Sequence, residues 1–243
     1  MEPFLHRGAV VALASISMVF LALSLLQPWF VIHDSYSTTS SGSYVWESDM
    51  RIYTRYYMYA EDVSRNFPVD WQMVAIQDDP MSGNSGLYDL MGLVNSGLLV
   101  CIGLAWLLTI AAFLNSRLMT FILAWITSAS SLFFMVVFSA KITTEVRASS
   151  QFLHYWPTSI VTGLFGKVTV SSPDFYSTDS WSWHPGWGWF LATAAVIFLI
   201  VVVVLVLHDV FIRAERDKAY REIEFSGNDE PKTNGDVDFE NKP

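Results

Sequence analysis

The sequence predicts an α-helical integral membrane protein, built as a four-helix transmembrane bundle with a small extracellular β-sheet domain formed by two outer loops. Hydrophobic residues make up 52% of the 243 residues and charged residues only 15%, whereas soluble domains carry about 25% charged residues. The segments outside the apolar stretches are rich in aromatic and β-branched residues, which favours strands. Four stretches lack Asp, Glu, Lys and Arg, and each reaches the roughly 20 residues that cross a bilayer: 8–32, 90–116, 118–140 and 180–208.

The spans follow one another in a regular order along the chain. A turn of very few residues, 115–117, forces the second and third spans to lie antiparallel and adjacent. All four spans must be helical, because lipid cannot satisfy a free backbone. The predicted order is an N-terminal segment 1–7, span 8–30, outer loop 31–88, span 89–114, turn 115–117, span 118–140, outer loop 141–187, span 188–210, and a tail 211–243 that is disordered from about residue 227.

Basic residues near the span ends predict the orientation. They are denser beside the start of the first span, the tight turn and the tail than in the two long loops. We therefore expect both termini in the cytoplasm and a location in the plasma membrane. The alternative is a cleaved signal peptide over residues 1–24, which would leave the orientation of the later spans unchanged. The basic residues on the expected inner side are Arg7, Arg117, Arg213, Arg216, Lys218 and Arg221.

The two outer loops are expected to fold together as one sheet of three to five strands over the helix ends. In the first loop, Arg51–Tyr59 is β-rich and partly alternating, which predicts a central strand. In the second loop, Gly166–Val170 is the best strand and is expected to pair at the margin of that sheet. No disulfide can hold such a domain, so we expect it to depend on buried aromatic side chains, with Trp46, Tyr53 and Trp71 as its core.

Short motifs near the span ends resemble a known family. Pro28-Trp29 closes the first span and Trp46 follows in the first loop. Together with four spans and a long β-rich first loop, they resemble the claudin and peripheral-myelin-protein architecture, which implies a bundle topped by an extracellular sheet. Claudins carry a cysteine pair in the first loop, whereas the single cysteine here is Cys101 in the second span. Their paracellular sealing role is therefore not implied. The segment Pro185–Trp189, where the fourth span begins, looks more like small prokaryotic four-span proteins.

Three histidines on the expected outer side are candidate metal ligands. His33, with Asp34 beside it, His154 and His184 could supply the imidazoles that copper or zinc accepts. No two of them have the spacing of a helical ligand pair, so the fold would have to gather them. The competing interpretation is that they are polar residues at the membrane interface. No other cofactor and no catalytic residue is predicted.

Small and polar residues of the second span predict a packing surface. Small side chains let membrane helices approach closely, and an amide can hydrogen-bond across the contact. This surface would serve packing within the bundle or against a partner subunit. Its residues are Gly92, Asn95, Ser96, Gly97 and Gly103.

These features leave three functions open. The first is a non-enzymatic four-span protein that acts through its outer domain in adhesion, in the cell envelope or as an accessory subunit of a membrane complex. The second is a transporter or channel for ions or small solutes, and the third is a metal-dependent membrane enzyme or metal-handling subunit that uses the outer histidines. A net charge of −9 argues against nucleic acid as a partner. The predicted partners are the lipid bilayer and a protein or second copy of the chain, bound through the outer domain or the second span.

Overall fold

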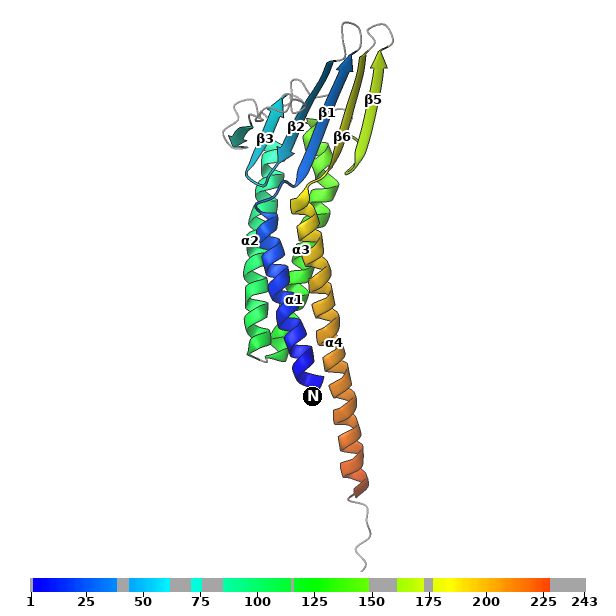
Figure 1. Cartoon of the computed structure of the whole chain (residues 1–243). Helices are drawn as coiled ribbons and strands as arrows, with labels where there is room; N and C mark the ends of the chain where they lie inside the picture. The colour runs from blue at the N-terminus through cyan, green and yellow to red at the C-terminus, as the bar shows by residue number, and fades with distance from the viewer. Residues whose placement is uncertain are drawn as a thin grey trace, which may run out of the picture.

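Four helices run side by side along most of the molecule, and one sheet stands at the end of the bundle (Figure 1). The computed structural model describes residues 2–38, 44–61, 71–75, 85–114, 116–148, 161–172 and 177–227, called the described residues below. Each helix is long and apolar enough to cross a membrane, so the four predicted spans are confirmed as candidate membrane helices. The helices are α1 (Glu2–Ser24), α2 (Ser85–Phe113), α3 (Arg117–Ala148) and α4 (Trp187–Gly227).

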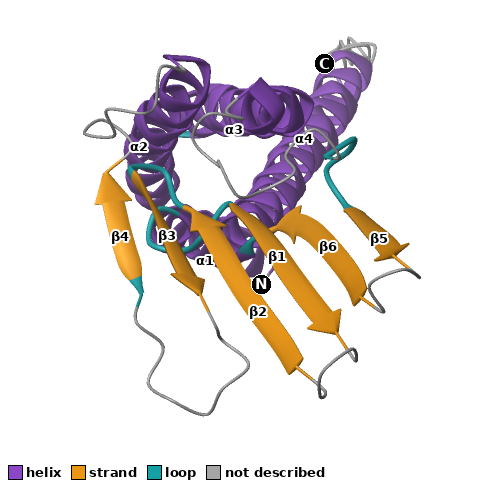
Figure 2. Cartoon of the chain, turned by 90° about the horizontal axis from the view of Figure 1, so that it is seen from above, coloured by secondary structure: helices purple, strands orange, loops and turns teal. Residues whose placement is uncertain are grey.

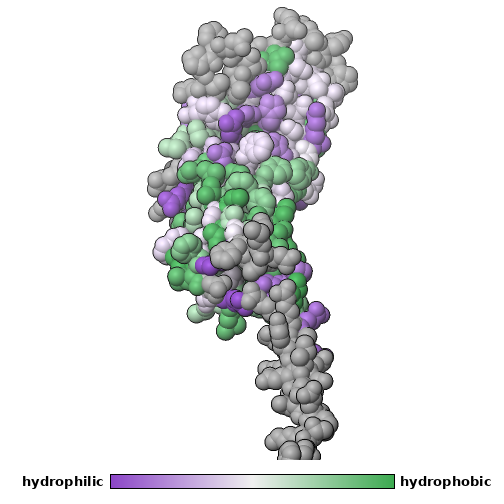
Figure 3. Space-filling model, turned by 60° about the horizontal axis from the view of Figure 1, so that its bottom comes forward, coloured by the Kyte–Doolittle hydropathy of each residue, from purple (hydrophilic) through white to green (hydrophobic). Residues whose placement is uncertain are grey.

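The helices form a ring in which each contacts its two neighbours, in the order α1, α2, α3, α4. Small side chains lie where helices meet, and Ala14, Ala105 and Ala124 are fully buried. The outward surfaces carry large apolar side chains, such as Trp125 and Phe133, that are more exposed than buried. A helix that is apolar on all sides suits lipid rather than water. Figure 3 shows the result as an apolar band with more polar zones on either side of it.

α1 and α2 begin a few residues before the predicted spans, at Glu2 and Ser85, and the other two helices continue well past the predicted ends. α3 passes residue 140 and ends at Ala148, because Ile142 and Val146 extend its buried stripe at helical spacing. α4 passes residue 210 and continues to Gly227. The rest of the tail, 228–243, for which disorder was predicted, lies outside the described residues.

Strands from both outer loops form one antiparallel sheet, in the order β4-β3-β2-β1-β6-β5. Seen down the bundle, the strands lie in a row along one side of the helical ring (Figure 2). The sheet has six strands rather than the predicted three to five. They are β1 (Phe30–Thr38), β2 (Tyr44–Ile52), β3 (Tyr56–Glu61), β4 (Gln72–Ala75), β5 (Gly166–Ser172) and β6 (Ser177–Pro185).

The prediction of a single central strand over Arg51–Tyr59 is wrong. The chain reverses within that stretch, between β2 and β3. There the backbone N–H of Tyr53 donates to the carbonyl of Tyr56 at 2.8 Å, and the two rings stack with centroids 4.5 Å apart. The reversal lets Ile52 stay buried at the end of β2 while β3 pairs back along the same strand.

The central strand is β1, which begins inside the predicted first span. α1 ends at Ser24 rather than near residue 30, and Pro28, which has no N–H for a helical hydrogen bond, follows. From Phe30 to Asp34 the side chains alternate between buried and half-buried, the pattern of a strand with one covered face. β5 lies at the sheet edge, as predicted for Gly166–Val170, but it pairs with β6 and not with the first loop.

The two segments that connect the bundle to the sheet, one after α1 and one before α4, are hydrogen-bonded to each other. Gly186 N–H donates to the Trp29 carbonyl at 3.0 Å, and Gly188 N–H donates to the Pro28 carbonyl at 2.8 Å. The Trp29 indole N–H in turn donates to the carbonyl of Ser24 at 2.8 Å. A Cβ on Gly186 would collide with Pro28, so the close approach requires glycine there. We call Pro28, Trp29, Gly186 and Gly188 the junction clasp.

Candidate functional site

The strands place alternate side chains on two faces of the sheet, an inner face toward the bundle and an outer face away from it. On the inner face, Phe30, Ile32 and Trp183 belong to the same buried core as Met91 of α2 and Phe138 of α3. The large apolar side chains at the base of the sheet are therefore buried in the core that they share with the helices. The outer face is therefore the surface that a ligand or partner can reach.

Hydroxyl side chains gather on three neighbouring strands of the outer face. The register places Ser35 opposite Ser180 and Ser37 opposite Thr178 across β1 and β6, and Thr169 of β5 lies on the other side of Ser180. Each hydroxyl can donate and accept a hydrogen bond. The hydroxyl patch consists of Ser35, Ser37, Thr169, Ser171, Thr178, Ser180 and Ser182.

A charged network lies beside the hydroxyl patch. His33 Nδ1 lies 2.6 Å from Asp49 Oδ1, and Arg51 Nη2 lies 3.5 Å from Asp49 Oδ2. The Arg51 guanidinium also lies 4.3 Å from the centre of the Trp71 ring, at the distance of a cation–π contact. Because these side chains are only partly buried, the network fixes their orientation more than it stabilises the fold.

The predicted histidines are placed as follows. His33 on β1 and His184 on β6 share the outer face, because the register pairs Val31 with His184 and His33 with Ser182. His154 lies outside the described residues. Neither Asp49 nor strand β6 was predicted from the sequence, although the alternation of Ser and Trp before His184 is the period of a strand.

The predicted ectodomain core residues Trp46, Tyr53 and Trp71 are each half-buried. The register puts Trp46 opposite Tyr36, far along β1 and β2 from the buried pair Phe30 and Ile52. Size and aromatic character suggested these residues, but proximity to the helix ends decides burial. The buried hydrophobic residues of the strands are Phe30, Ile32, Met50, Ile52, Ala60 and Trp183.

The predicted packing residues of the second span divide between two surfaces of α2. Gly97 is buried against α3, where an added Cβ would collide with the Phe134 ring. An added Cβ on Gly92 or Gly103 would meet nothing within 4 Å, and Ser96 is exposed. Asn95 is half-buried. Packing inside the bundle thus uses Gly97, whereas Gly92, Ser96 and Gly103 lie on a more open side of the helix.

One buried carboxyl group lies on the inner face. Asp34 is 8% exposed, and its pKa is raised from 3.8 to about 6. Burial is the largest cause and the Asp179 carboxylate adds to it, whereas His33 and Trp181 act in the opposite direction. The indole of Trp181 is close enough to lower the pKa of Asp34. Within the described part of the chain, however, neither the indole N–H of Trp181 nor Oδ1 of Asp34 has a hydrogen-bond partner at ordinary geometry. Burial of the neighbouring Ser48 hydroxyl shows that this polar row is shielded from water.

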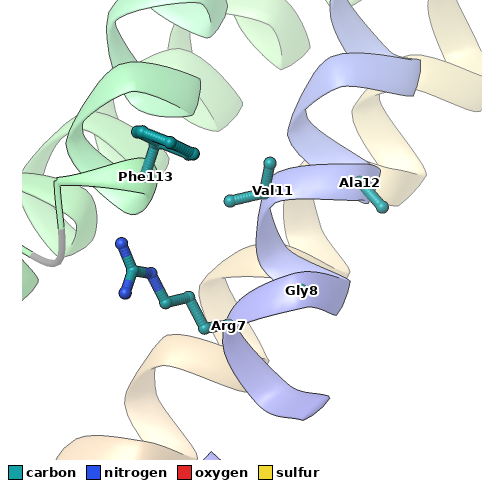
Figure 4. Close-up of a pocket in the computed structure, with 5 residues that line it drawn as sticks. All are labelled: Arg7, Gly8, Val11, Ala12 and Phe113. Atoms are coloured by element: carbon teal, nitrogen blue, oxygen red, sulfur yellow. The ribbon is translucent and has the colours of Figure 1, made fainter. Parts of the chain in front are cut away.

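A groove of about 530 Å³ lies between α1 and α2 at the end of the bundle opposite the sheet (Figure 4). The Arg7 side chain donates from Nε to the carbonyl of Ala112 at 3.1 Å, and its guanidinium lies 6.0 Å from the centre of the Phe113 ring. Arg7 thereby satisfies a carbonyl at the C-terminal end of α2. The rest of the lining, Gly8, Val11, Ala12 and Phe113, is apolar and offers no side chain for chemistry.

Comparison with protein-family models and with curated proteins gives no match to this chain. Its function must therefore be argued from the two faces of the sheet and from the bundle.

Proposed function

We propose that this chain is a non-enzymatic four-span membrane protein that works through its outer sheet as an adhesion, cell-envelope or accessory subunit of a membrane complex. The observation that carries the proposal is the difference between the two faces of the sheet: the inner face packs on the bundle, and the outer face carries polar side chains. The inner face is used by the protein itself, because its apolar base packs into the helical core. The outer face carries hydroxyl and charged side chains, and none of them belongs to the buried core among the described residues.

The chemistry of the outer face suits a macromolecular partner. The hydroxyl patch offers neutral donors and acceptors from three adjacent strands, and the His33–Asp49–Arg51 network adds charge at its border. Side chains of this kind form adaptable hydrogen bonds across wet interfaces. Within the described part of the sheet β5 is the edge strand, so one side of its backbone pairs with no other described strand. Lys167 near its start discourages unspecific strand pairing.

The bundle argues against transport. Among the described residues, the buried polar side chains within the helices are hydroxyls only, and Asp34 of the sheet is the one buried charged residue. Ser17, Thr120 and Thr127 donate to backbone carbonyls four residues earlier in the chain. A conduction path needs a lining of charged or polar groups, so the bundle is better suited to holding the sheet at a membrane surface.

The proposal places the sheet outside the plasma membrane and both termini in the cytoplasm, on the distribution of basic residues described above. The layout is also compatible with the claudin-like resemblance, since its Pro28-Trp29 motif lies at the junction between bundle and sheet. The segment Pro185–Trp189, which resembles small prokaryotic four-span proteins, lies at the same junction. The resemblance supports a shared architecture and not a shared role, because the loop cysteines of claudins are absent here.

Site-specific photocrosslinking in native membranes tests the proposal. A benzophenone amino acid is placed at Ser35 or at Ser180, which are partners in the register, and at Ile197, which is 55% exposed on the membrane portion of α4. We expect both outer positions to yield the same protein adduct, identified by mass spectrometry, and the Ile197 position not to yield it. The proposal is overturned if neither outer position gives a protein adduct while the variants remain folded and inserted.

A further inference from the structure

The two described histidines of the sheet are neighbours on its outer face. The register pairs Val31 with His184 and His33 with Ser182, so His33 and His184 stand diagonally across β1 and β6. Diagonal neighbours in an antiparallel pair have Cα atoms about 7–8 Å apart and remain within reach of long or aromatic side chains. Two imidazoles at such positions can share one ion when their Nε2 atoms face the space between them, since metal–nitrogen bonds are about 2.0–2.1 Å long.

In both histidines the Nδ1 atom is engaged in a hydrogen bond, which leaves Nε2 as the nitrogen that can bind a metal ion. His33 Nδ1 faces Asp49 Oδ1 at 2.6 Å, and His184 Nδ1 faces the carbonyl of Pro185 at 2.7 Å. A carboxylate and a carbonyl can only accept, so in the neutral ring each Nδ1 carries the proton and each Nε2 carries the lone pair. A hydrogen bond from one ring nitrogen to a carboxylate or carbonyl is the usual support of a metal-binding histidine.

We propose that Nε2 of His33 and Nε2 of His184 bind a divalent transition-metal ion of the copper and zinc class on the outer face of the sheet. Imidazole nitrogen is a favoured ligand of these ions. Among the described residues no group of three or more His, Cys, Asp or Glu side chains gathers for a metal. The site is therefore a two-histidine site, completed by water.

The charges around the pair permit a dication. Asp49 carries a negative charge directly behind His33, and the positive charge of Arg51 is paired with the other oxygen of that carboxylate and lies against the Trp71 ring. Lys167 is opposite Ser182 in the register and is exposed, so its long side chain can turn outward into water. This site does not depend on the proposed partner function, because it needs only the geometry of β1, β2 and β6.

Copper titration of the purified full chain in nanodiscs at neutral pH tests the site. We expect one Cu²⁺ per chain, with two imidazole nitrogens resolved in the electron paramagnetic resonance spectrum. His33→Ala and His184→Ala should each weaken binding at least tenfold, and Asp49→Asn should weaken it about 10–100-fold through loss of the support behind His33. Because His184 is exposed, its replacement should not disturb folding, which the thermal unfolding of the variant verifies.

Two further histidines provide matched controls. His208→Ala, on α4, and His154→Ala should leave the affinity within twofold of the unmodified chain. The inference is overturned if binding survives in the His33→Ala, His184→Ala double variant, or if His154→Ala or His208→Ala abolishes it. It is also overturned if the spectrum shows one nitrogen ligand or none.

Discussion

The indole of Trp29 and the backbone of Gly188 are in direct contact: a Cβ added to Gly188 would lie 2.6 Å from Cδ1 of Trp29. Trp29 also meets the Phe138 ring edge-on, with centroids 5.0 Å apart. Through this one aromatic side chain the end of the first span, the start of the last span and the upper part of α3 are fixed together beneath the sheet.

Gly188→Ala should therefore destabilise the protein. The new methyl group has no room beside Trp29, and overpacking of this kind costs roughly 1–3 kcal/mol. The measurement is thermal unfolding in detergent. Gly103→Ala is the matched control, because an added Cβ there meets nothing within 4 Å. Equal melting temperatures for the two variants would contradict the importance of the junction clasp.

Trp183→Ala should damage the outer domain more than Trp46→Ala does. Trp183 is 2% exposed, its indole N–H donates to the carbonyl of Gly163 at 2.8 Å, and Gly166 leaves space for its ring. Truncation of a buried aromatic side chain costs roughly 3–5 kcal/mol, and half-buried Trp46 should cost less. Limited proteolysis of the sheet at increasing temperature compares the two variants. If Trp46→Ala is cut first, then the core of the domain lies farther from the bundle than the structure indicates.

Asp34 should make the stability depend on pH in a direction unusual for a carboxylate. Its pKa is about 6 in the folded chain against 3.8 in a solvated one, a difference worth roughly 3 kcal/mol. Because the folded pKa is the higher one, protonation favours folding. The stabilising contribution is complete below about pH 3.8 and is lost as the pH rises through about 6.

Replacement of Asp34 by Asn removes this dependence, since an amide does not titrate. The gain in melting temperature of Asp34→Asn over the unmodified chain should be larger at pH 8 than at pH 5. Glu47→Gln, on the outer face, is the control and should show no such trend. A difference between Asp34→Asn and the unmodified chain that stays constant over this range would show that the Asp34 carboxyl is not shielded.

Accessibility from the two sides of the membrane tests the predicted orientation. Single cysteines are placed at Ser180 of the sheet and at Glu215 near the far end of α4, in a Cys101→Ala background. An impermeant thiol reagent should label only the Ser180 site in intact cells and both sites after lysis. Labelling at Glu215 alone in intact cells would invert the topology and remove the sheet from the outside.

The bundle could be predicted from the sequence because each span is a long run without charge, and such a run is recognised without knowing which other segments it contacts. The start of β1 could not, since Phe30 and Ile32 are as apolar as the span before them and their alternation becomes visible only once the helix is known to end at Ser24. The local pattern of Arg51–Tyr59 likewise says nothing about the reversal after Ile52, which is set by pairing between strands.

The candidate site was only partly predictable for a related reason. His33 and His184 are far apart in the chain, and only the register between β1 and β6 makes them neighbours. Asp49 became part of the site through the pairing of β1 with β2. The chemistry of imidazole identifies the histidines as candidate ligands from the sequence alone. Which residues lie beside them depends on the strand register, which the sequence pattern does not show.

The position of β1 between β2 and β6 has a consequence for biosynthesis. Phe30 pairs with Ile52, which the ribosome adds soon afterwards, and with Pro185, which it adds only when most of the chain has been made. At about 5–20 residues per second, the first half of the sheet waits roughly 7–27 seconds with one long edge of β1 uncovered. Nascent chains therefore pass through a stage at which that edge can pair with the wrong strand, and slowing synthesis between the second and fourth spans should increase aggregation.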